Sequence, residues 1–188
     1  MRDLEIRPAT SWNDVRTVFG PNGAYSGCWC MWFRVTGAEF GAMGAAGRED
    51  GLQTLVESPE RAPGVLAYLE GAAVGWCAVA PREEQPRLVR SPVTKPADPG
   101  EAGVWSVTCF YVTRAGRGRG VPAALLAGAV SYAAGQGARV VEGYPKDTDE
   151  PLPAAELFRG WRSLFEEAGF EETARRTPTR PTMRRILP

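Results

Sequence analysis

Residues 104–135 run through a strand, a glycine-rich loop and a helix, and this succession constrains the fold of the chain most. Residues 104–112 are rich in β-branched and aromatic side chains, which is typical of a buried strand. Pro122 suits the first turn of a helix, where the missing N–H would have no partner. The apolar positions of residues 121–133 fall on one helical face, and Gly135 and Gly137 end the helix. These residues predict the first half of a βαβ unit.

A further strand is predicted directly after this helix, at Arg139–Tyr144. A strand that follows a crossover helix pairs parallel to the strand before it, so the chain is expected to belong to the α/β class. Closer to the N-terminus, the turn Glu70-Gly71 separates two apolar runs and predicts an antiparallel hairpin. The remaining segments predict strands at 4–8, 170–174 and 182–187, helices at 12–19, 39–46, 50–58 and 154–168, and a long surface loop at 86–103.

The loop before the helix has the residues of an anion-binding site. Unpaired N–H groups converge at a helix N-terminus, where the helix dipole is positive. Gly116, Gly118 and Gly120 let a phosphate approach the backbone, and Arg117 and Arg119 add positive charge. We therefore predict that this loop binds a pyrophosphate. Neither a Lys-Ser or Lys-Thr pair nor the spacing Gly-x-Gly-x-x-Gly is present, which excludes a P-loop and a dinucleotide fingerprint.

The overall composition limits the partners and the chemistry. There are 22 lysine and arginine residues against 22 aspartate and glutamate residues, so we expect binding to neither nucleic acid nor a membrane surface. The chain has no histidine, and Cys28 and Cys30 lack a second cysteine pair, so we expect no metal site. The start of the chain does not have the pattern of a leader and no apolar stretch is long enough to span a bilayer, which favours a cytoplasmic location.

Residues 110–126 resemble the acyl-CoA signature of the GCN5-related N-acetyltransferases (GNAT), a strand followed by Arg-x-x-Gly-x-(Gly/Ala) and an apolar helix. Residues 71–76 are similar to a hairpin of that family, and residues 164–170 to its last helix and the Gly-Phe pair after it. The resemblance implies an α/β fold in one domain over residues 1–188. It implies a strongly twisted mixed sheet with helices on both faces, whose central parallel strands splay apart to admit acetyl-pantetheine.

The implied activity is transfer of acetyl from acetyl-CoA to the primary amine of a small molecule by direct attack. The alternative is a non-catalytic acyl-CoA-binding sensor or interaction module, and a homodimer is possible in either case. Phe165 stands where many members carry the tyrosine that protonates the departing thiolate, and Pro122 occupies the last Gly/Ala position of the motif. The residues that the resemblance assigns to the coenzyme are Phe110, Tyr111 and Val112 for pantetheine, and Arg117, Gly118, Arg119, Gly120, Val121 and Pro122 for the pyrophosphate.

Glu142 and Tyr144 are the candidate catalytic residues. They lie two positions apart in the predicted strand, so both side chains point to one face of the sheet. Glu142 can act as the base that takes a proton from the amine, and Tyr144 as the acid that protonates the thiolate. The alternative for Glu142 is that it is solvated or pairs with an arginine.

The acceptor site has three candidates, Trp29, Trp32 and Arg34. Arg34 can anchor a substrate carboxylate. The alternative for the aromatic residues is ordinary core packing. The acidic residues of the 145–153 loop, Asp147, Asp149 and Glu150, predict a small cationic amine as the acceptor, unless they merely keep the loop solvated.

Overall fold

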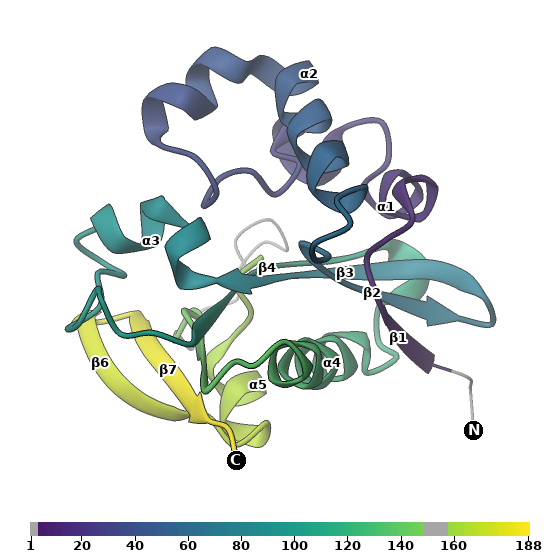
Figure 1. Ribbon diagram of the computed structural model, residues 1–188. Helices are drawn as coiled ribbons and strands as arrows, with labels where there is room; N and C mark the ends of the chain where they lie inside the picture. The colour runs from purple at the N-terminus through teal and green to yellow at the C-terminus, as the bar shows by residue number, and fades with distance from the viewer. Residues whose placement is uncertain (1–3, 149–157) are drawn as a thin grey trace.

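The computed structural model describes residues 4–148 and 158–188, which contain one seven-stranded mixed sheet (Figure 1). The strand order is β1-β2-β3-β4-β5-β7-β6. Only β4 and β5 pair in parallel, and the other neighbours are antiparallel. The α/β prediction and the parallel central pair are thus confirmed. The strands are β1 Leu4–Pro8, β2 Gly64–Leu69, β3 Ala72–Pro81, β4 Val104–Val112, β5 Val140–Gly143, β6 Glu171–Thr177 and β7 Arg180–Ile186.

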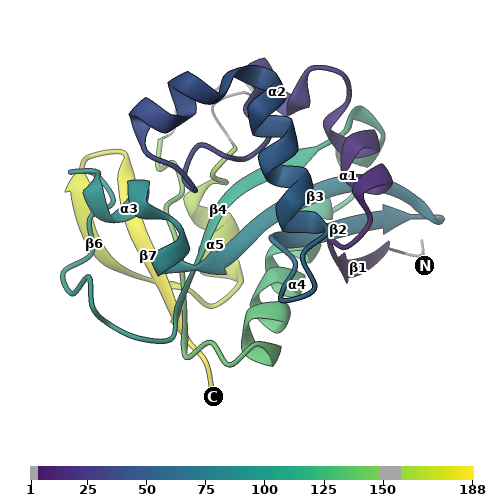
Figure 2. The same cartoon turned by 45° about the horizontal axis from the view of Figure 1, so that its top comes forward.

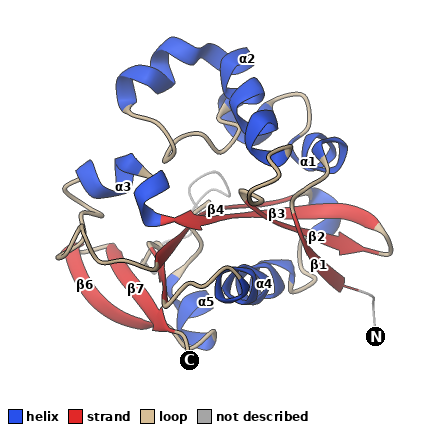
Figure 3. Ribbon diagram, in the orientation of Figure 1, coloured by secondary structure: helices blue, strands red, loops and turns tan. Residues whose placement is uncertain are grey.

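Helices cover both faces of this sheet, as Figure 3 shows. One face carries α1 (Trp12–Phe19), α2 (Gly37–Val56) and α3 (Pro86–Arg90). The other carries α4 (Val121–Gly135) and α5 (Arg162–Glu167). None of the helices in the described residues is long and apolar enough to cross a membrane. The view in Figure 2 shows α2 lying along the sheet face opposite α4.

Each face of the sheet has its own apolar core. Val107 and Phe110 of β4 point toward α4 and pack with its buried face. Cys109 and Tyr111, the alternate residues of the same strand, point toward α1 and α2 and pack beside Trp76. Because side chains of a strand alternate between faces, β4 contributes to both layers.

Three elements differ from those predicted. The two helices expected at 39–46 and 50–58 form the single element α2, which Gly44 interrupts with a φ of +62°. The 86–103 loop begins with α3, because Pro86 occupies the first helical turn, where no N–H is needed. The helix expected at 154–168 begins only at Arg162: Trp161 is extended and Gly160 has a φ of +77°, and residues 154–157 lie outside the described residues.

The central parallel strands separate halfway along β4. Pairing with β5 runs from Val104↔Val140 to Val107↔Gly143 and then stops. On its other edge, β4 stays paired with β3, and the register shift between Ala78 and Val79 leaves Thr108 as an extra residue. Such a bulge bends a strand away from its neighbour. The second half of β4 is therefore free of β5, as the resemblance implies.

Candidate functional site

The glycine loop lies between the end of β4 and the N-terminus of α4. Gly118 and Gly120 have φ values of +69° and +75°, in the left-handed region that favours glycine. A Cβ added at either would meet no heavy atom within 4 Å. In the part of the chain that the structure describes, the N–H groups of Gly118, Arg119 and Gly120 have no hydrogen-bond acceptor. Such unpaired donors at a helix N-terminus bind anions.

The charges around this loop are of one sign. Arg114, Arg117 and Arg119 are exposed, and none of them forms an ion pair with a described residue. Helix α4 has no charged residue of its own, and Pro122 lies in its first turn. A pyrophosphate would therefore meet backbone donors, a helix dipole and three guanidinium groups together.

At the edge of β4 predicted to hold pantetheine, the described residues form one hydrogen bond. The N–H of Phe110 donates to the carbonyl oxygen of Phe158 at 2.5 Å, in the gap where β4 and β5 have separated. The Phe110 ring packs edge-to-face against Phe165, which is fully buried. The residues thus fit the pyrophosphate end of the coenzyme directly. At the acyl end, an acyl oxygen would replace the carbonyl oxygen of Phe158 as the acceptor of the Phe110 N–H.

Glu142 and Tyr144 are brought together, in a buried polar cluster. The exposed fraction of Glu142 is 3% and that of Arg82 is 2%, and Arg82 Nη1 lies 3.1 Å from Glu142 Oε1. Arg184 Nε lies 3.4 Å from the same oxygen. The Tyr144 hydroxyl donates to Glu142 Oε2 at 2.7 Å and lies 3.2 Å from Ser106 Oγ. Burial raises the pKa of Tyr144 well above its usual value, so the phenol is protonated at neutral pH.

These contacts favour the alternative in which Glu142 pairs with an arginine. Both carboxylate oxygens already accept hydrogen bonds from Arg82 and Tyr144, which leaves little room for an amine proton. The catalytic roles of Glu142 and Tyr144 stay a prediction. The sequence did not predict Arg82 as the partner of Glu142. Arg82 directly follows the apolar strand β3, and its charge at that position is the only feature of the sequence that points to it.

A pocket of about 490 Å³ opens on the α1 and α2 side of β4. We call it the β4 pocket. Its backbone wall is strained, since Ala24, Ser26 and Cys30 have positive φ values without being glycine. Strain of this kind gathers at functional sites. The apolar and thiol side chains that line it include Tyr25, Cys28, Trp32, Phe40, Cys109 and Tyr111.

Of the three predicted acceptor residues, only Trp32 lines the β4 pocket. It is 38% exposed and packs edge-to-face against Phe40. Trp29 is buried and stacks on Phe19 with ring centroids 5.5 Å apart. Arg34 donates to the carbonyl of Pro63 and lies 3.5 Å from Glu84, away from this pocket. Trp29 and Arg34 thus have the contacts of core and structural residues.

The acidic loop is only partly described, because Asp149 and Glu150 lie outside the described residues. Asp147 lies 2.6 Å from Arg175 and 3.2 Å from Arg162. Hydrogen bonds from these arginines lower the pKa of Asp147. Because Arg162 and Arg175 compensate its negative charge, Asp147 contributes less to the attraction of a cationic amine than an unpaired carboxylate would.

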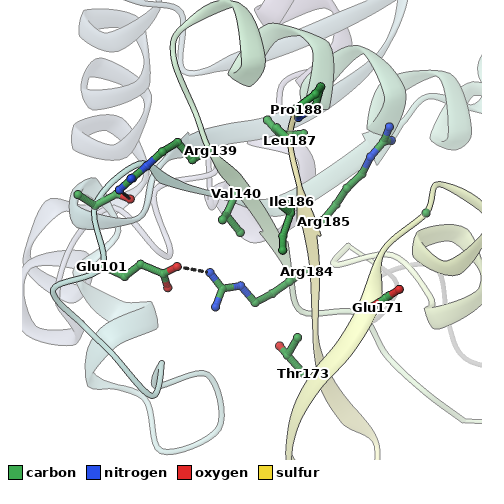
Figure 4. A pocket seen from close by; sticks show the side chains of 12 residues that line it. Glu101, Arg139, Val140, Glu171, Thr173, Arg184, Arg185, Ile186, Leu187 and Pro188 are labelled. Atoms are coloured by element: carbon green, nitrogen blue, oxygen red, sulfur yellow. Dashed lines mark hydrogen bonds and ion pairs between the residues drawn. The ribbon is translucent and has the colours of Figure 1, made fainter.

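A larger cavity, of about 850 Å³, lies elsewhere (Figure 4). Glu101, Arg184 and Ile186 are among its lining residues, and an ion pair of 2.7 Å joins Glu101 to Arg184. This cavity lies where β4 and β5 begin, whereas the glycine loop follows the end of β4. Ligands of open α/β sheets bind at the carboxyl ends of the parallel strands, so the glycine loop and the β4 pocket form the better candidate site.

Comparisons with known proteins agree with this geometry. Residues 31–170 match the model of the acetyltransferase (GNAT) family. A search of curated protein sequences found no match.

Solved structures of similar fold cover almost the whole chain. One is the PaiA N-acetyltransferase from Thermoplasma acidophilum in complex with coenzyme A (11% identity, 98% of this chain and 99% of that chain, TM-score 0.57). An N-acetyltransferase from Staphylococcus aureus Mu50 has 13% identity, covers 99% of each chain and has a TM-score of 0.56. An acetyltransferase of the GNAT family from Streptococcus pneumoniae has 14% identity, covers 99% of this chain and 100% of that one, and has a TM-score of 0.55. These likenesses show the fold, and the match over residues 31–170 shows that the chain belongs to the acetyltransferase (GNAT) family.

Proposed function

We propose that the protein transfers the acetyl group of acetyl-CoA to the primary amine of a small molecule. The observation that carries the proposal is the glycine loop: unpaired N–H groups at residues 118–120 and unpaired guanidinium groups at Arg117 and Arg119 stand at the N-terminus of α4. This loop directly follows the strand that has separated from β5. A neighbour of similar fold binds coenzyme A, which supports the same use of the loop here.

In this proposal the loop residues Arg117–Pro122 hold the pyrophosphate, and the backbone of Phe110–Val112 pairs with pantetheine. The acyl oxygen takes the place of the Phe158 carbonyl at the N–H of Phe110. That N–H donates to the oxygen as it gains negative charge in the transition state, which lowers the barrier. The amine must be neutral to attack, because an ammonium has no lone pair.

The bond between nitrogen and the acyl carbon forms as the carbon–sulfur bond breaks, and the thiolate leaves. Phe165 carries no proton to donate to it. Tyr144, protonated at neutral pH, is the proposed acid, unless coenzyme A leaves as the thiolate, whose pKa is about 8 to 9. Glu142 is the candidate base, in competition with the structural ion pair that its contacts favour, and Glu142→Gln separates the two roles. A single domain over residues 1–188, a cytoplasmic location and a homodimer belong to the same proposal.

The coenzyme site is tested with a matched pair of glycine variants at the two ends of α4. Gly120 and Gly137 have φ values of +75° and +84°, and an added Cβ at either meets no heavy atom within 4 Å. Valine therefore introduces similar backbone strain, about 1 to 2 kcal/mol, at both positions. Only at Gly120 does the new side chain occupy the space of a pyrophosphate.

Calorimetric titration with acetyl-CoA should show an affinity lowered at least about 10-fold in Gly120→Val and unchanged in Gly137→Val. Equal affinities would refute the coenzyme site. Release of free thiol from acetyl-CoA in the presence of amines then separates the enzyme from the non-catalytic module. Binding without amine-dependent thiol release across a broad panel would favour the module.

A further inference from the structure

Arg159 carries a positive charge that the described residues leave uncompensated. It lines the β4 pocket, with its guanidinium 4.8 Å from the centroid of the Phe33 ring and 5.4 Å from that of Phe158. Its Nε is buried, and no described residue accepts a hydrogen bond from it. Burial, and after it the nearby charge of Arg180, lower the pKa of Arg159 to about 10. A largely desolvated cation without an anion is costly, and an anionic ligand would offset that cost.

The rest of the pocket wall is also apolar and cationic. Arg48 lies over the ring of Phe40 at 4.3 Å and lines the pocket. Arg87, which does not itself line the pocket, covers the ring of the lining residue Trp32 at 3.8 Å, and its Nε and Nη2 are buried without a hydrogen-bond partner among the described residues. Within those residues, the lining of the pocket contains no aspartate or glutamate. A wall of this kind repels a cationic acceptor and suits an anionic group attached to an apolar body.

The position of Arg159 in the chain relates this charge to the proposed reaction. Arg159 directly follows Phe158, whose carbonyl contacts the N–H of Phe110 at 2.5 Å. Phe110 is the residue at which the acyl oxygen is proposed to lie, and its chain neighbours Cys109 and Tyr111 line the β4 pocket together with Arg159. A single acceptor bound in this pocket would therefore contact both Arg159 and the part of β4 around Phe110.

We propose that the acceptor is an amino acid with a large apolar or aromatic side chain, bound through its carboxylate by Arg159. The side chain lies against Trp32 and Phe40, and the amine points toward β4. A planar guanidinium binds a carboxylate through two parallel hydrogen bonds, which fixes the orientation of the amine. This inference rests on the proposed acetyl transfer, and it replaces the cationic amine that the acidic loop predicted.

The experiment compares ligands that differ only in the carboxylate. The complex of the protein with coenzyme A is titrated with N-acetyl-L-phenylalanine and with its amide, and thiol release is measured with L-phenylalanine, L-phenylalaninamide and phenethylamine. The variant is Arg159→Gln, and the control is Arg176→Gln, which removes an exposed arginine of β6 that donates to the carbonyl of Lys95.

We expect the acid to bind about 10- to 100-fold tighter than the amide, the range for a hydrogen-bonded charge pair. Arg159→Gln should abolish this preference and leave binding of the amide unchanged, and Arg176→Gln should keep the preference. An acid that binds no better than its amide, or a preference that survives Arg159→Gln, would overturn the proposal. So would the absence of measurable binding of the acid.

Two further readouts separate the possible failures. Among the described residues Arg159 has ring contacts with Phe33 and Phe158 but no anion, so Arg159→Gln should melt within a few degrees of wild type. A larger fall would mean a structural role and overturn the proposal. Acetyl-CoA binding tests the underlying function independently. A wild-type protein that binds acetyl-CoA and acetylates amines without a carboxylate preference refutes only the acceptor; one that does not bind acetyl-CoA refutes the proposed function.

Discussion

The buried pair of Arg82 and Glu142 provides the sharpest test of what Glu142 does. Glu142→Gln removes the negative charge and leaves Arg82 buried beside a neutral amide. Breaking one partner of a buried ion pair costs about 3 to 5 kcal/mol. Arg82 keeps a hydrogen bond to the carbonyl of Asp98 at 2.7 Å, and Arg184 keeps Glu101. We therefore expect a loss at the lower end, about 3 kcal/mol.

For a chain of 188 residues this loss corresponds to a fall in Tm of about 6 to 12 °C. Calorimetry and urea denaturation of Glu142→Gln measure it. The matched control is Glu101→Gln, whose ion pair with Arg184 is partly exposed, with side-chain exposures of 25% and 33%. Exposed pairs contribute less than about 1 kcal/mol, so the control should melt within a few degrees of wild type.

The companion variant Arg82→Met/Glu142→Leu replaces the pair with apolar side chains of similar length. Such replacements are often neutral, so it should recover most of the lost stability. A structural Glu142 also predicts that the folded fraction of Glu142→Gln keeps its turnover within about 10-fold. If Glu142→Gln melts like wild type and loses about 100-fold or more in turnover, the ion-pair argument is refuted and Glu142 is the base.

Three further predictions concern the surroundings of the site. Gly143→Ala should lower the free energy of unfolding by about 1 to 3 kcal/mol, because the added Cβ would lie 2.0 Å from Phe165 Cε1. Adding Phe165→Leu to this variant should restore part of the loss. If the single and the double variant both melt at the wild-type Tm, this packing is contradicted. Burial raises the pKa of Cys28 to about 11, so a thiol reagent at about pH 8 should label Cys28 far more slowly in the folded than in the denatured protein, and equal rates would count against this burial. Burial and the hydrogen bond to Asp14 raise the pKa of Tyr68 from 10.0 to about 12. As the pH rises from 10 to 12, the Tyr68 phenol ionises in the unfolded chain before it does in the folded protein, so the free energy of unfolding should fall. Tyr68→Phe should make that fall smaller.

The sequence predicted the parts of the fold that depend on local patterns. The hairpin around Glu70-Gly71 and the β4, glycine loop and α4 unit were correct because their signals are periodic and contiguous. The short helix α3 was missed because four prolines in residues 86–103 dominate the pattern, although a proline in the first turn is compatible with a helix.

The candidate site depends on contacts across long stretches of chain, and there the sequence was less informative. Glu142 meets Arg82, sixty residues away, and no local pattern indicates that pairing. Arg34 and Arg159 are both arginines beside aromatic residues. Only the fold shows that Arg34 has Glu84 and Pro63 as partners while Arg159 faces the β4 pocket.

Because the charges at the start of α4 are all positive, binding of the proposed coenzyme there would also stabilise the fold. Arg114, Arg117 and Arg119 stand beside the positive end of a helix without acidic side chains, so they destabilise the ligand-free protein by mutual repulsion. A bound polyanion would remove that repulsion. Because it binds only the folded protein, it would also raise the free energy of unfolding, by about 2.7 kcal/mol at a concentration 100 times its Kd. On the proposed coenzyme site, a higher coenzyme concentration would therefore raise the stability of the fold as well as the rate of the reaction.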